Sequence, residues 1–171
     1  MIVNELEEIK MKIIPYEKHY KNQVIALILY LQNFDNKVDL SLEEQPDMND
    51  IETYYLKNGG GFWLAINETD DVIGTLGLMK KEGHFGILKK FFVDPTYRGK
   101  EAGVSKELYD QLINHAKQNN IDCIVLDTPA NCKRAHHFYI KKGFQKIKFT
   151  ELPFDYDFPD RDSYFFLNSW F

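Results

Sequence analysis

Apolar and polar residues alternate along the chain with two different periods, and each change of period marks a boundary between expected elements. Tyr20, Val24, Ile28 and Leu31 recur every three or four residues, which predicts an amphipathic helix over residues 17–33. Similar patterns predict three further helices, over residues 46–58, 99–119 and 131–142. Short runs rich in apolar and aromatic residues predict strands over residues 11–14, 62–66, 72–79, 85–93, 121–126, 144–149 and 164–167.

These elements follow one another in the order β-α-α-β-β-β-α-β-α-β-β, which indicates a mixed α/β fold. The short polar turns at residues 67–71 and 82–83 favour antiparallel hairpins in the first half of the sheet. Gly74 and Gly77 lie inside one of those strands, where glycine marks a bulge or a close approach of backbone. We expect one domain over residues 1–171, with residues 1–10 as a short extension.

The stretch from Leu88 to Leu108 contains the clearest local signal. An apolar strand ends at Asp94-Pro95, because proline cannot extend a ladder of backbone hydrogen bonds. Arg98 and several small residues follow, and then a helical pattern begins. The first turn of such a helix directs free backbone N–H groups and the positive end of the helix dipole at one point. The stretch therefore predicts an anion site, most naturally for phosphate.

Composition narrows the classes of function. A net charge of −5 argues against general nucleic-acid binding. No apolar run of about 18 residues occurs, so neither a membrane span nor a membrane partner is expected, and the acidic N-terminus lacks the pattern of a signal peptide. Cys123 and Cys132 fit neither a disulfide framework nor a metal pattern, and the histidines show no ligand spacing. We therefore expect reduced thiols, no bound metal and a cytoplasmic protein.

Two motifs resemble the GCN5-related N-acetyltransferase (GNAT) family. The first is similar to the family's loop for the pyrophosphate of acyl-CoA, commonly Arg/Gln-x-x-Gly-x-Gly/Ala, and here reads Val93-x-Pro95-x-Tyr97-Arg98-Gly99-Lys100-Glu101-Ala102-Gly103. The second is similar to the family's late helix and following strand, and reads Ala135-x-x-Phe138-Tyr139-x-x-x-Gly143-Phe144. The resemblance covers nearly the whole chain. It implies the GNAT (acyl-CoA N-acyltransferase) fold, with a mixed central sheet of about six or seven strands flanked by about four helices.

The resemblance also implies a binding site for acetyl-CoA as the donor substrate. Backbone N–H groups from Arg98 to Val104 would bind the pyrophosphate, and main-chain groups of Phe92 and Val93 would bind the pantetheine amides. The basic residues Lys133, Arg134, Lys89 and Lys106 are candidates for the 3′-phosphate. The donor-binding residues expected on this basis are Phe92, Val93, Arg98, Gly99, Lys100, Glu101, Ala102, Gly103, Val104 and Lys133.

The sequence departs from the family pattern at three places. Glu101 stands where the family has its central glycine. Pointing outward it would suit the helix dipole, and pointing inward it would repel the pyrophosphate. Cys132 stands where many members have asparagine, and the strand before the loop lacks the glutamate that some members use as a catalytic base.

Tyr139 is the expected catalytic acid. Acetyl transfer from a thioester expels a thiolate whose conjugate acid has a pKa of about 8.5. A phenol can hydrogen-bond that sulfur and donate a proton as it leaves, and the family places a tyrosine at this position for that purpose. The alternative is a helix aromatic that only packs.

The base that deprotonates the amine is left open among several groups. Asp127 ends a buried strand that leads toward the site and is the favoured candidate. Its alternative role is to cap the turn at Thr128-Pro129. Other candidates are Glu82, His84, His136 and His137, and a chain of water molecules would need no single base.

The leading interpretation is an acyl-CoA-dependent N-acetyltransferase that moves an acetyl group from acetyl-CoA to a primary amine in a ternary complex. The acceptor is a small molecule or a protein, and acidic loops at residues 35–50 and 151–162 favour a cationic one by electrostatic steering. The rival, supported by Glu101 and the missing glutamate, is a non-catalytic CoA-binding sensor or interaction module. A non-CoA α/β domain is a third interpretation. Because family members are often dimers, the aromatic C-terminus is read either as a buried edge or as a homodimer interface.

Overall fold

The structure is a computed structural model that describes residues 10–99, 103–156 and 162–170. Its strands are β1 (Met11–Pro15), β2 (Gly61–Asn67), β3 (Val72–Lys80), β4 (Phe85–Val93), β5 (Cys123–Pro129), β6 (Gln145–Ile147) and β7 (Ser163–Ser169). Its α-helices are α1 (Lys21–Tyr30), α2 (Pro46–Asn49), α3 (Val104–Gln118) and α4 (Lys133–Lys141). Short 3₁₀ and π segments are η1 (Lys18–Tyr20), η2 (Leu31–Asp35), η3 (Glu52–Leu56), η4 (Pro95–Tyr97) and η5 (Phe149–Glu151).

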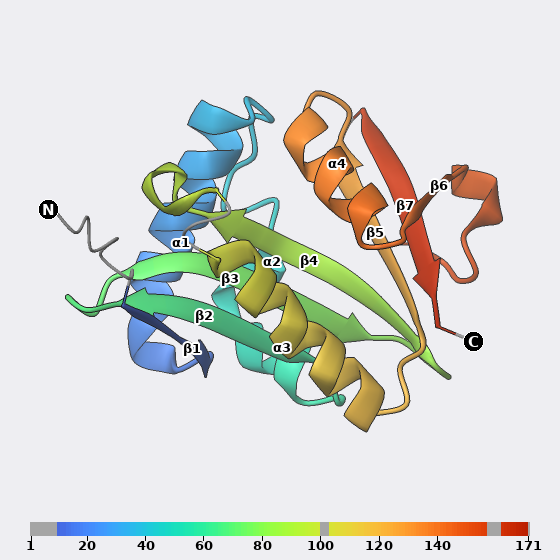
Figure 1. The fold of residues 1–171 in the computed structure, drawn as a ribbon, viewed down its shortest axis with the longest axis horizontal. Helices are drawn as coiled ribbons and strands as arrows, with labels where there is room; N and C mark the ends of the chain where they lie inside the picture. Colours follow the sequence, from blue (N-terminus) through green and yellow to red (C-terminus); the bar gives the residue numbers. More distant parts are fainter. Residues whose placement is uncertain (1–9, 100–102, 157–161, 171) are drawn as a thin grey trace, which may run out of the picture.

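The strands form one sheet in the order β1-β2-β3-β4-β5-β7-β6 (Figure 1). The strands β1 to β4 pair antiparallel, β4 and β5 pair parallel across the α3 connection, and β7 pairs antiparallel with both β5 and β6. The predicted element order and the mixed sheet with an antiparallel first half are therefore confirmed.

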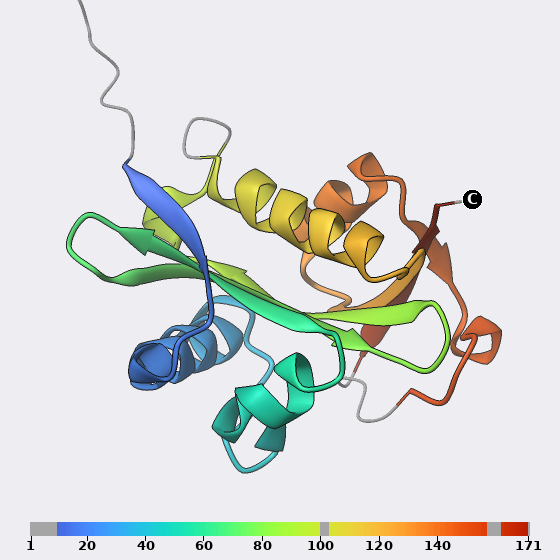
Figure 2. The ribbon, with the colours of Figure 1, turned by 90° about the horizontal axis from the view of Figure 1, so that it is seen from below.

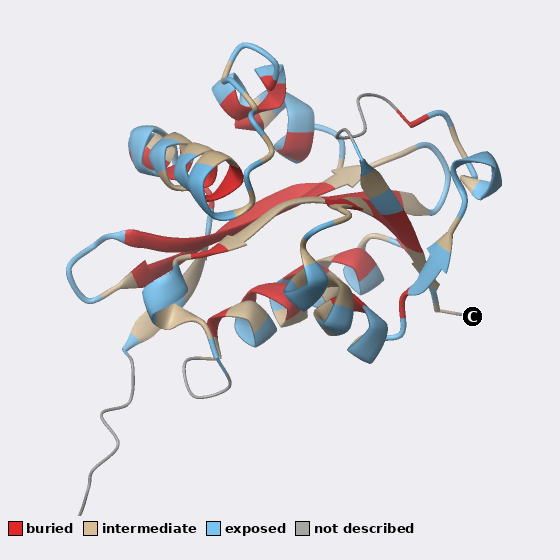
Figure 3. Ribbon diagram, turned by 90° about the horizontal axis from the view of Figure 1, so that it is seen from above, coloured by how far each residue is buried: buried red, intermediate tan, exposed pale blue. Residues whose placement is uncertain are grey.

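Helices cover both faces of the sheet (Figure 2). One face carries α1 and α2, and the other carries α3 and α4. Val24, Ile28 and Phe62 belong to the hydrophobic cluster under α1 and α2, whereas Leu108 and Leu112 belong to the cluster under α3. Figure 3 shows the buried residues concentrated along the central strands, between these layers. Burial on both faces explains why β2 and β3 read as nearly continuous apolar runs.

The start of α3 differs from the sequence prediction. The helix begins at Val104 and not at Gly99, because Gly99 and Gly103 have φ of 120° and 65°, outside the right-handed helical region. Gly103 serves as the N-cap residue. Lys100, Glu101 and Ala102 lie outside the described residues, so the orientation of Glu101 stays a prediction.

The predicted helix over residues 46–58 is interrupted at Asp50. This residue has φ of −144°, and its carboxylate accepts a hydrogen bond from the N–H of Thr53 at 3.2 Å. The chain therefore stops α2 and restarts as the π segment η3. The sequence offered no glycine or proline at this break.

The C-terminal aromatic residues belong mainly to the buried sheet. Because β7 lies between β5 and β6, Phe165 and Phe166 are buried, and Trp170 packs against the α3-side core. Cys123 and Cys132 are both free thiols. In the described part of the chain, none of the helices has the length and apolar character needed to cross a membrane.

Candidate active site

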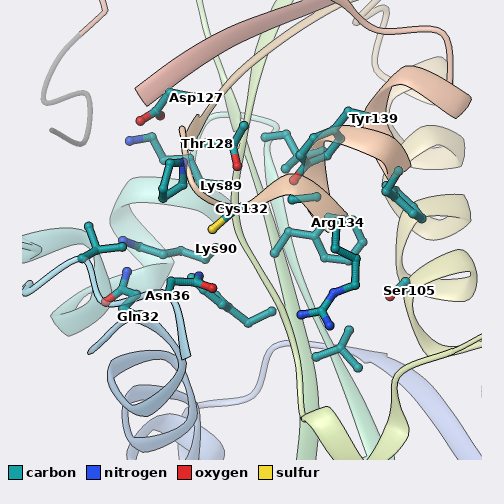
Figure 4. A pocket seen from close by; sticks show the side chains of 18 of the residues that line it. Gln32, Asn36, Lys89, Lys90, Ser105, Asp127, Thr128, Cys132, Arg134 and Tyr139 are labelled. Carbon is teal, nitrogen blue, oxygen red and sulfur yellow. The ribbon is translucent and has the colours of Figure 1, made fainter. Parts of the chain in front are cut away.

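A cleft opens where the two parallel strands at the centre of the sheet separate. Pairing of β4 with β5 joins Phe85–Ile87 to Cys123–Val125 and, in these fully described strands, goes no further. The cavity has a volume of about 1720 Å³ and is lined by described residues of η2, β4, the turn after β4, the end of β5 and α4 (Figure 4). Phe92 and Val93 are among the lining residues, so both predicted pantetheine contacts lie at the cleft.

The turn after β4 begins as a capped 3₁₀ segment. The Asp94 carboxylate accepts a hydrogen bond from the N–H of Thr96 at 2.9 Å, and Pro95 fixes the first position of η4. Gly99 and Gly103 line the cleft, whereas Val104 is buried at the start of α3. Both glycines have a positive φ that an L side chain would strain. Described parts of the predicted pyrophosphate loop thus border the cavity.

One end of the cleft, here called the arginine end, contains Arg98, Arg134 and Asp35. Arg98 donates from Nε to the carbonyl of Val93 at 2.9 Å and from Nη2 to the Asp35 carboxylate at 2.7 Å. The same carboxylate lies 3.8 Å from Nη2 of Arg134. The end of η2 is thereby joined to both the turn after β4 and the start of α4.

The other predicted phosphate contacts lie in different surroundings. Lys133 is exposed at the first position of α4 and lines the cleft. Lys106 also lines the cleft and bonds Asp110 at 2.7 Å, one helical turn later. Lys89 lies away from the arginine end, with its ammonium 5.6 Å from the centre of the Tyr156 ring. We therefore do not retain Lys89 as a phosphate contact.

Tyr139 lies on α4 and its hydroxyl is directed into the cleft (Figure 4). Its ring packs among the rings of Phe91, Phe138, Phe144 and Phe166. Burial raises the pKa of the phenol above its usual value, and the nearby carboxylate of Asp127 adds to the rise. The hydroxyl therefore stays protonated at neutral pH and can donate a hydrogen bond inside the cleft.

Asp127 lies near the end of β5 and lines the same cleft. Its carboxylate accepts a hydrogen bond from the Tyr156 hydroxyl, a contact that the sequence did not indicate. Among the described cleft residues, the other candidate bases are absent: Glu82, His84, His136 and His137 do not line the cavity. His84 instead contacts Asp122, and His136 contacts the carbonyl of Pro129. Of the bases named from the sequence, Asp127 is thus the one that lines the cleft, and its role as a base stays a prediction.

A second part of the cleft, here called the lysine end, contains Lys89, Lys90, Gln45 and Asp47. Lys90 donates from its ammonium to the side-chain carbonyl of Gln45 and lies 3.8 Å from the Asp47 carboxylate. Gln45 exchanges two hydrogen bonds with the buried amide of Gln32, at 2.8 and 2.9 Å. Sequence reasoning missed this group. Two adjacent lysines inside an apolar strand were the available signal, and nothing marked the glutamines.

Four acids of the predicted acidic stretch over residues 35–50 have hydrogen-bond partners within the protein. The Asp35 carboxylate pairs with Arg98, and the Glu44 carboxylate accepts a hydrogen bond from the N–H of Ser41 at 2.9 Å. The Asp47 carboxylate accepts from the Tyr55 hydroxyl at 2.5 Å, and the Asp50 carboxylate accepts from the N–H of Thr53. These carboxylates are therefore committed to internal contacts. Hydrogen bonds to neutral groups leave Glu44, Asp47 and Asp50 charged, so the attraction of a cationic acceptor stays a prediction.

The described residues contain no group of three or more His, Cys, Asp or Glu side chains arranged to hold a metal ion.

Comparisons with known proteins agree with the sequence motifs. A model of the Acetyltransferase (GNAT) family matches residues 25–144. An acetyltransferase of the GNAT family from Staphylococcus aureus Mu50 has a TM-score of 0.89 and 37% sequence identity, covering 94% of this chain and 99% of that one. An acetyltransferase from Streptococcus agalactiae 2603 also has a TM-score of 0.89, with 38% identity over 94% of this chain and 98% of that one.

Curated relatives include an N-acetylaspartate synthetase from Danio rerio. It is 36% identical over 115 residues, which are 66% of this chain and 39% of the relative. The chain thus spans about two fifths of that relative's length.

Proposed function

Because the chain belongs to the GNAT acetyltransferase family, we propose that it transfers an acetyl group from acetyl-CoA to a primary amine by direct attack in a ternary complex. The observation that supports this most is the position of the Tyr139 hydroxyl, which reaches into the cleft between the separated strands β4 and β5. A donor along β4 and an acceptor in the same cleft would meet without a covalent enzyme intermediate.

The arginine end fits the phosphates of the donor. Arg98 and Arg134 both border the cleft, and a guanidinium can bind phosphate oxygens through two parallel hydrogen bonds. Gly99 and Gly103 let the backbone turn beside them. Acetyl-CoA would therefore exchange its phosphates for the Asp35 carboxylate that these arginines contact here.

Tyr139 would hydrogen-bond the sulfur as the C–S bond breaks. The amine nitrogen forms the new C–N bond, and the proton that it loses balances the charge of the departing thiolate. Since the raised pKa of Tyr139 opposes formation of a phenolate, its role is to stabilise the sulfur through a donated hydrogen bond, with Asp127 as the proposed group that removes the amine proton.

The test measures binding and turnover separately. Calorimetry with acetyl-CoA reports binding, and thiol release with a panel of amines reports transfer, with mass spectrometry identifying the acetylated product. The panel includes aspartate, because relatives bear the name N-acetylaspartate synthetase. Binding with acetylation of at least one amine is expected. Binding without thiol release on any acceptor would instead favour the non-catalytic CoA-binding module.

Asp127→Asn tests the proposed base in the same assay. If Asp127 removes the amine proton, this variant loses rate most strongly at low pH, where the amine is mostly ammonium. A pH–rate profile unchanged by Asp127→Asn contradicts the assignment. Tyr156→Phe is the matched variant, because it removes the hydrogen bond to Asp127 and leaves the carboxylate in place.

A further inference from the structure

Thr128 has a buried hydroxyl whose hydrogen bonds the described part of the protein does not supply. The buried polar and charged side chains of the described residues are those of Gln32, Gln45, Asp47, Thr75 and Thr128. The first four bond to other groups of the protein, and Thr75 donates to the carbonyl of Lys90, in the bulge of β4, at 2.7 Å. Thr128 is only 5% exposed, and no described residue bonds its hydroxyl. A buried polar group of this kind calls for a partner from outside the protein, such as a ligand.

Strand alternation places the Thr128 side chain on the same face of the sheet as Tyr139. Leu126, two residues earlier on β5, packs in the hydrophobic cluster that also contains Tyr139. Val125 packs in a separate cluster on the other face, and Asp127 follows it there. Within the fully described strands β4 and β5, pairing ends at Val125, so Thr128 lies where the cleft has opened and lines its wall.

The hydroxyls of Thr128 and Tyr139 are both directed into the cleft (Figure 4). They belong to neighbouring elements, because His136, one turn before Tyr139 on α4, contacts the carbonyl of Pro129 at 2.9 Å, next to Thr128. Tyr139 is 6% exposed, and among the described residues its hydroxyl makes no hydrogen bond to the protein, including one to Thr128. One ligand atom between the two side chains can therefore accept from both hydroxyls.

We propose that Thr128 is a further catalytic residue, and that its hydroxyl and the Tyr139 hydroxyl together donate hydrogen bonds to the sulfur of acetyl-CoA. The proposal rests on the proposed acetyl transfer. In that reaction the lone pair of the amine forms the C–N bond, the electron pair of the C–S bond passes to sulfur, and the proton that the amine loses passes to the base. The negative charge that develops on sulfur would then be stabilised by two donors held on separate elements.

The test compares the binding of CoA with that of desulfo-CoA, which lacks the sulfur. Calorimetry is done at about pH 9, where a thiol with a pKa of about 8.5 is mostly thiolate. The wild type should bind CoA about tenfold more tightly than desulfo-CoA, and Thr128→Val should reduce that ratio to about threefold. Valine keeps the shape of threonine, so the affinity for desulfo-CoA should stay within about twofold. Thr128→Ser keeps the hydroxyl and should keep the ratio, whereas an unchanged ratio in Thr128→Val overturns the proposal.

The acidity of the bound thiol gives a second measurement. Two hydrogen-bond donors favour the thiolate, so the pKa of the bound CoA thiol should lie below that of free CoA and should rise in Thr128→Val. Ultraviolet absorbance of the thiolate follows this titration, and subtracting the desulfo-CoA complex removes the signals of Cys123 and Cys132. If Thr128→Val leaves this pKa unchanged, Thr128 does not donate to the sulfur. With an amine that the wild type acetylates, kcat in Thr128→Val should fall about tenfold.

Thermal stability separates a hydroxyl kept for a ligand from a structural one. Thr128→Val breaks no hydrogen bond within the described protein, so its melting temperature should not fall. Thr75→Val is the matched variant: it loses the bond to the Lys90 carbonyl and should unfold at a lower temperature. An equal loss of stability in the two variants overturns the proposal.

The same measurements distinguish failure of this proposal from failure of the proposed function. If the wild type binds neither CoA nor desulfo-CoA, the acetyltransferase function fails and this proposal fails with it. If the wild type binds both compounds with a ratio that does not depend on Thr128, this proposal alone is overturned.

Discussion

The two ends of the cleft hold their charges in different ways. At the arginine end, Asp35 contacts two guanidinium groups, of which Arg134 is 70% exposed and Arg98 is 19% exposed. At the lysine end, Lys90 and Asp47 are nearly buried, and a reciprocal pair of buried glutamine amides supports them. One end can change ion-pair partners at the surface, whereas the other presents a charge fixed by interior hydrogen bonds.

This difference suggests a division of labour within the cleft. Exposed ion pairs contribute about 0–1 kcal/mol to stability, so Arg134, which is 70% exposed, can release Asp35 at little expense when a phosphate arrives. A buried polar group left without its partner destabilises by about 1–3 kcal/mol, so the lysine end resists rearrangement. Donor binding would therefore move side chains at the arginine end, whereas the lysine end would keep its arrangement.

Tyr139→Phe has the largest expected effect, because Tyr139 would act on the reaction itself. We expect kcat to fall about 100-fold, since the leaving sulfur loses its hydrogen-bond donor. The KM for acetyl-CoA should stay within about threefold, and thermal unfolding should change little because the ring still packs among its four aromatic neighbours. An unchanged kcat would remove Tyr139 from the mechanism.

The pH dependence of kcat gives an independent check on Tyr139. Because its pKa is raised above about 10, the hydroxyl keeps its proton as the pH increases through the range where the acceptor amine loses its own. The wild-type rate should therefore rise with pH and show no fall below about pH 10. A falling limb at lower pH that disappears in Tyr139→Phe contradicts a protonated, buried phenol.

Gln45→Leu tests the fixed character of the lysine end. The change leaves the buried Gln32 amide without its reciprocal partner and removes a hydrogen-bond acceptor of Lys90. We expect the free energy of unfolding in denaturant to fall by about 2 kcal/mol. The KM for acetyl-CoA should stay unchanged, because Gln45 does not contact the described groups assigned to the donor.

Glu43→Gln is the matched control for Gln45→Leu, because Glu43 is exposed on the same loop. Its unfolding free energy should stay within about 0.5 kcal/mol of the wild type. If Gln45→Leu is equally mild, the lysine end is not a rigid network and the contrast between the two ends fails.

Much of the fold was predictable from the chain, because local patterns agreed with the tertiary structure. The helical spacing of Leu108 and Leu112 and the apolar runs of β2 and β4 placed those elements correctly. The starts and stops of helices were less accessible. The predicted helix was extended back to Gly99, because the residues from Gly99 to Gly103 did not visibly interrupt the helical pattern. The positive φ of Gly99 and Gly103, which excludes both from the helix, is a property of the folded turn.

The site was predictable where a motif described it and not where distant residues assembled it. Tyr139 and Asp127 both line the cleft as expected. Asp35 and Arg98, by contrast, are separated by 63 positions in sequence, and Gln45 and Lys90 by 45. Such pairs depend on how α1 and α2 pack against β4, and no local spacing encodes that packing. The bulge at Lys90 similarly needs the partner strand, because register is a property of two strands.

Arg98→Met tests the donor role of the arginine end. We expect the KM for acetyl-CoA to rise about tenfold through the loss of a charged hydrogen bond to phosphate. The kcat should stay within about twofold, and the free energy of unfolding should fall by no more than about 1 kcal/mol. Lys117→Met removes one positive charge outside the cleft and should leave the KM unchanged. A large loss of stability with an unaltered KM would make Arg98 a structural residue.

Asp35→Asn has the smallest expected effect and the most specific sign. The Asp35 carboxylate contacts Arg98 at 2.7 Å and lies 3.8 Å from Arg134, so it occupies the groups that we assign to the donor phosphates. Removing its charge should lower the KM for acetyl-CoA about threefold at low salt, and the gain should shrink as salt screens the charges. Asp39→Asn, an exposed acid on the same loop that does not line the cleft, should leave the KM unchanged.

In the Arg98→Met background the gain from Asp35→Asn should also diminish, because the effects of two residues that act through one contact are not additive. A higher KM in Asp35→Asn would instead mean that this carboxylate positions the arginines for the donor.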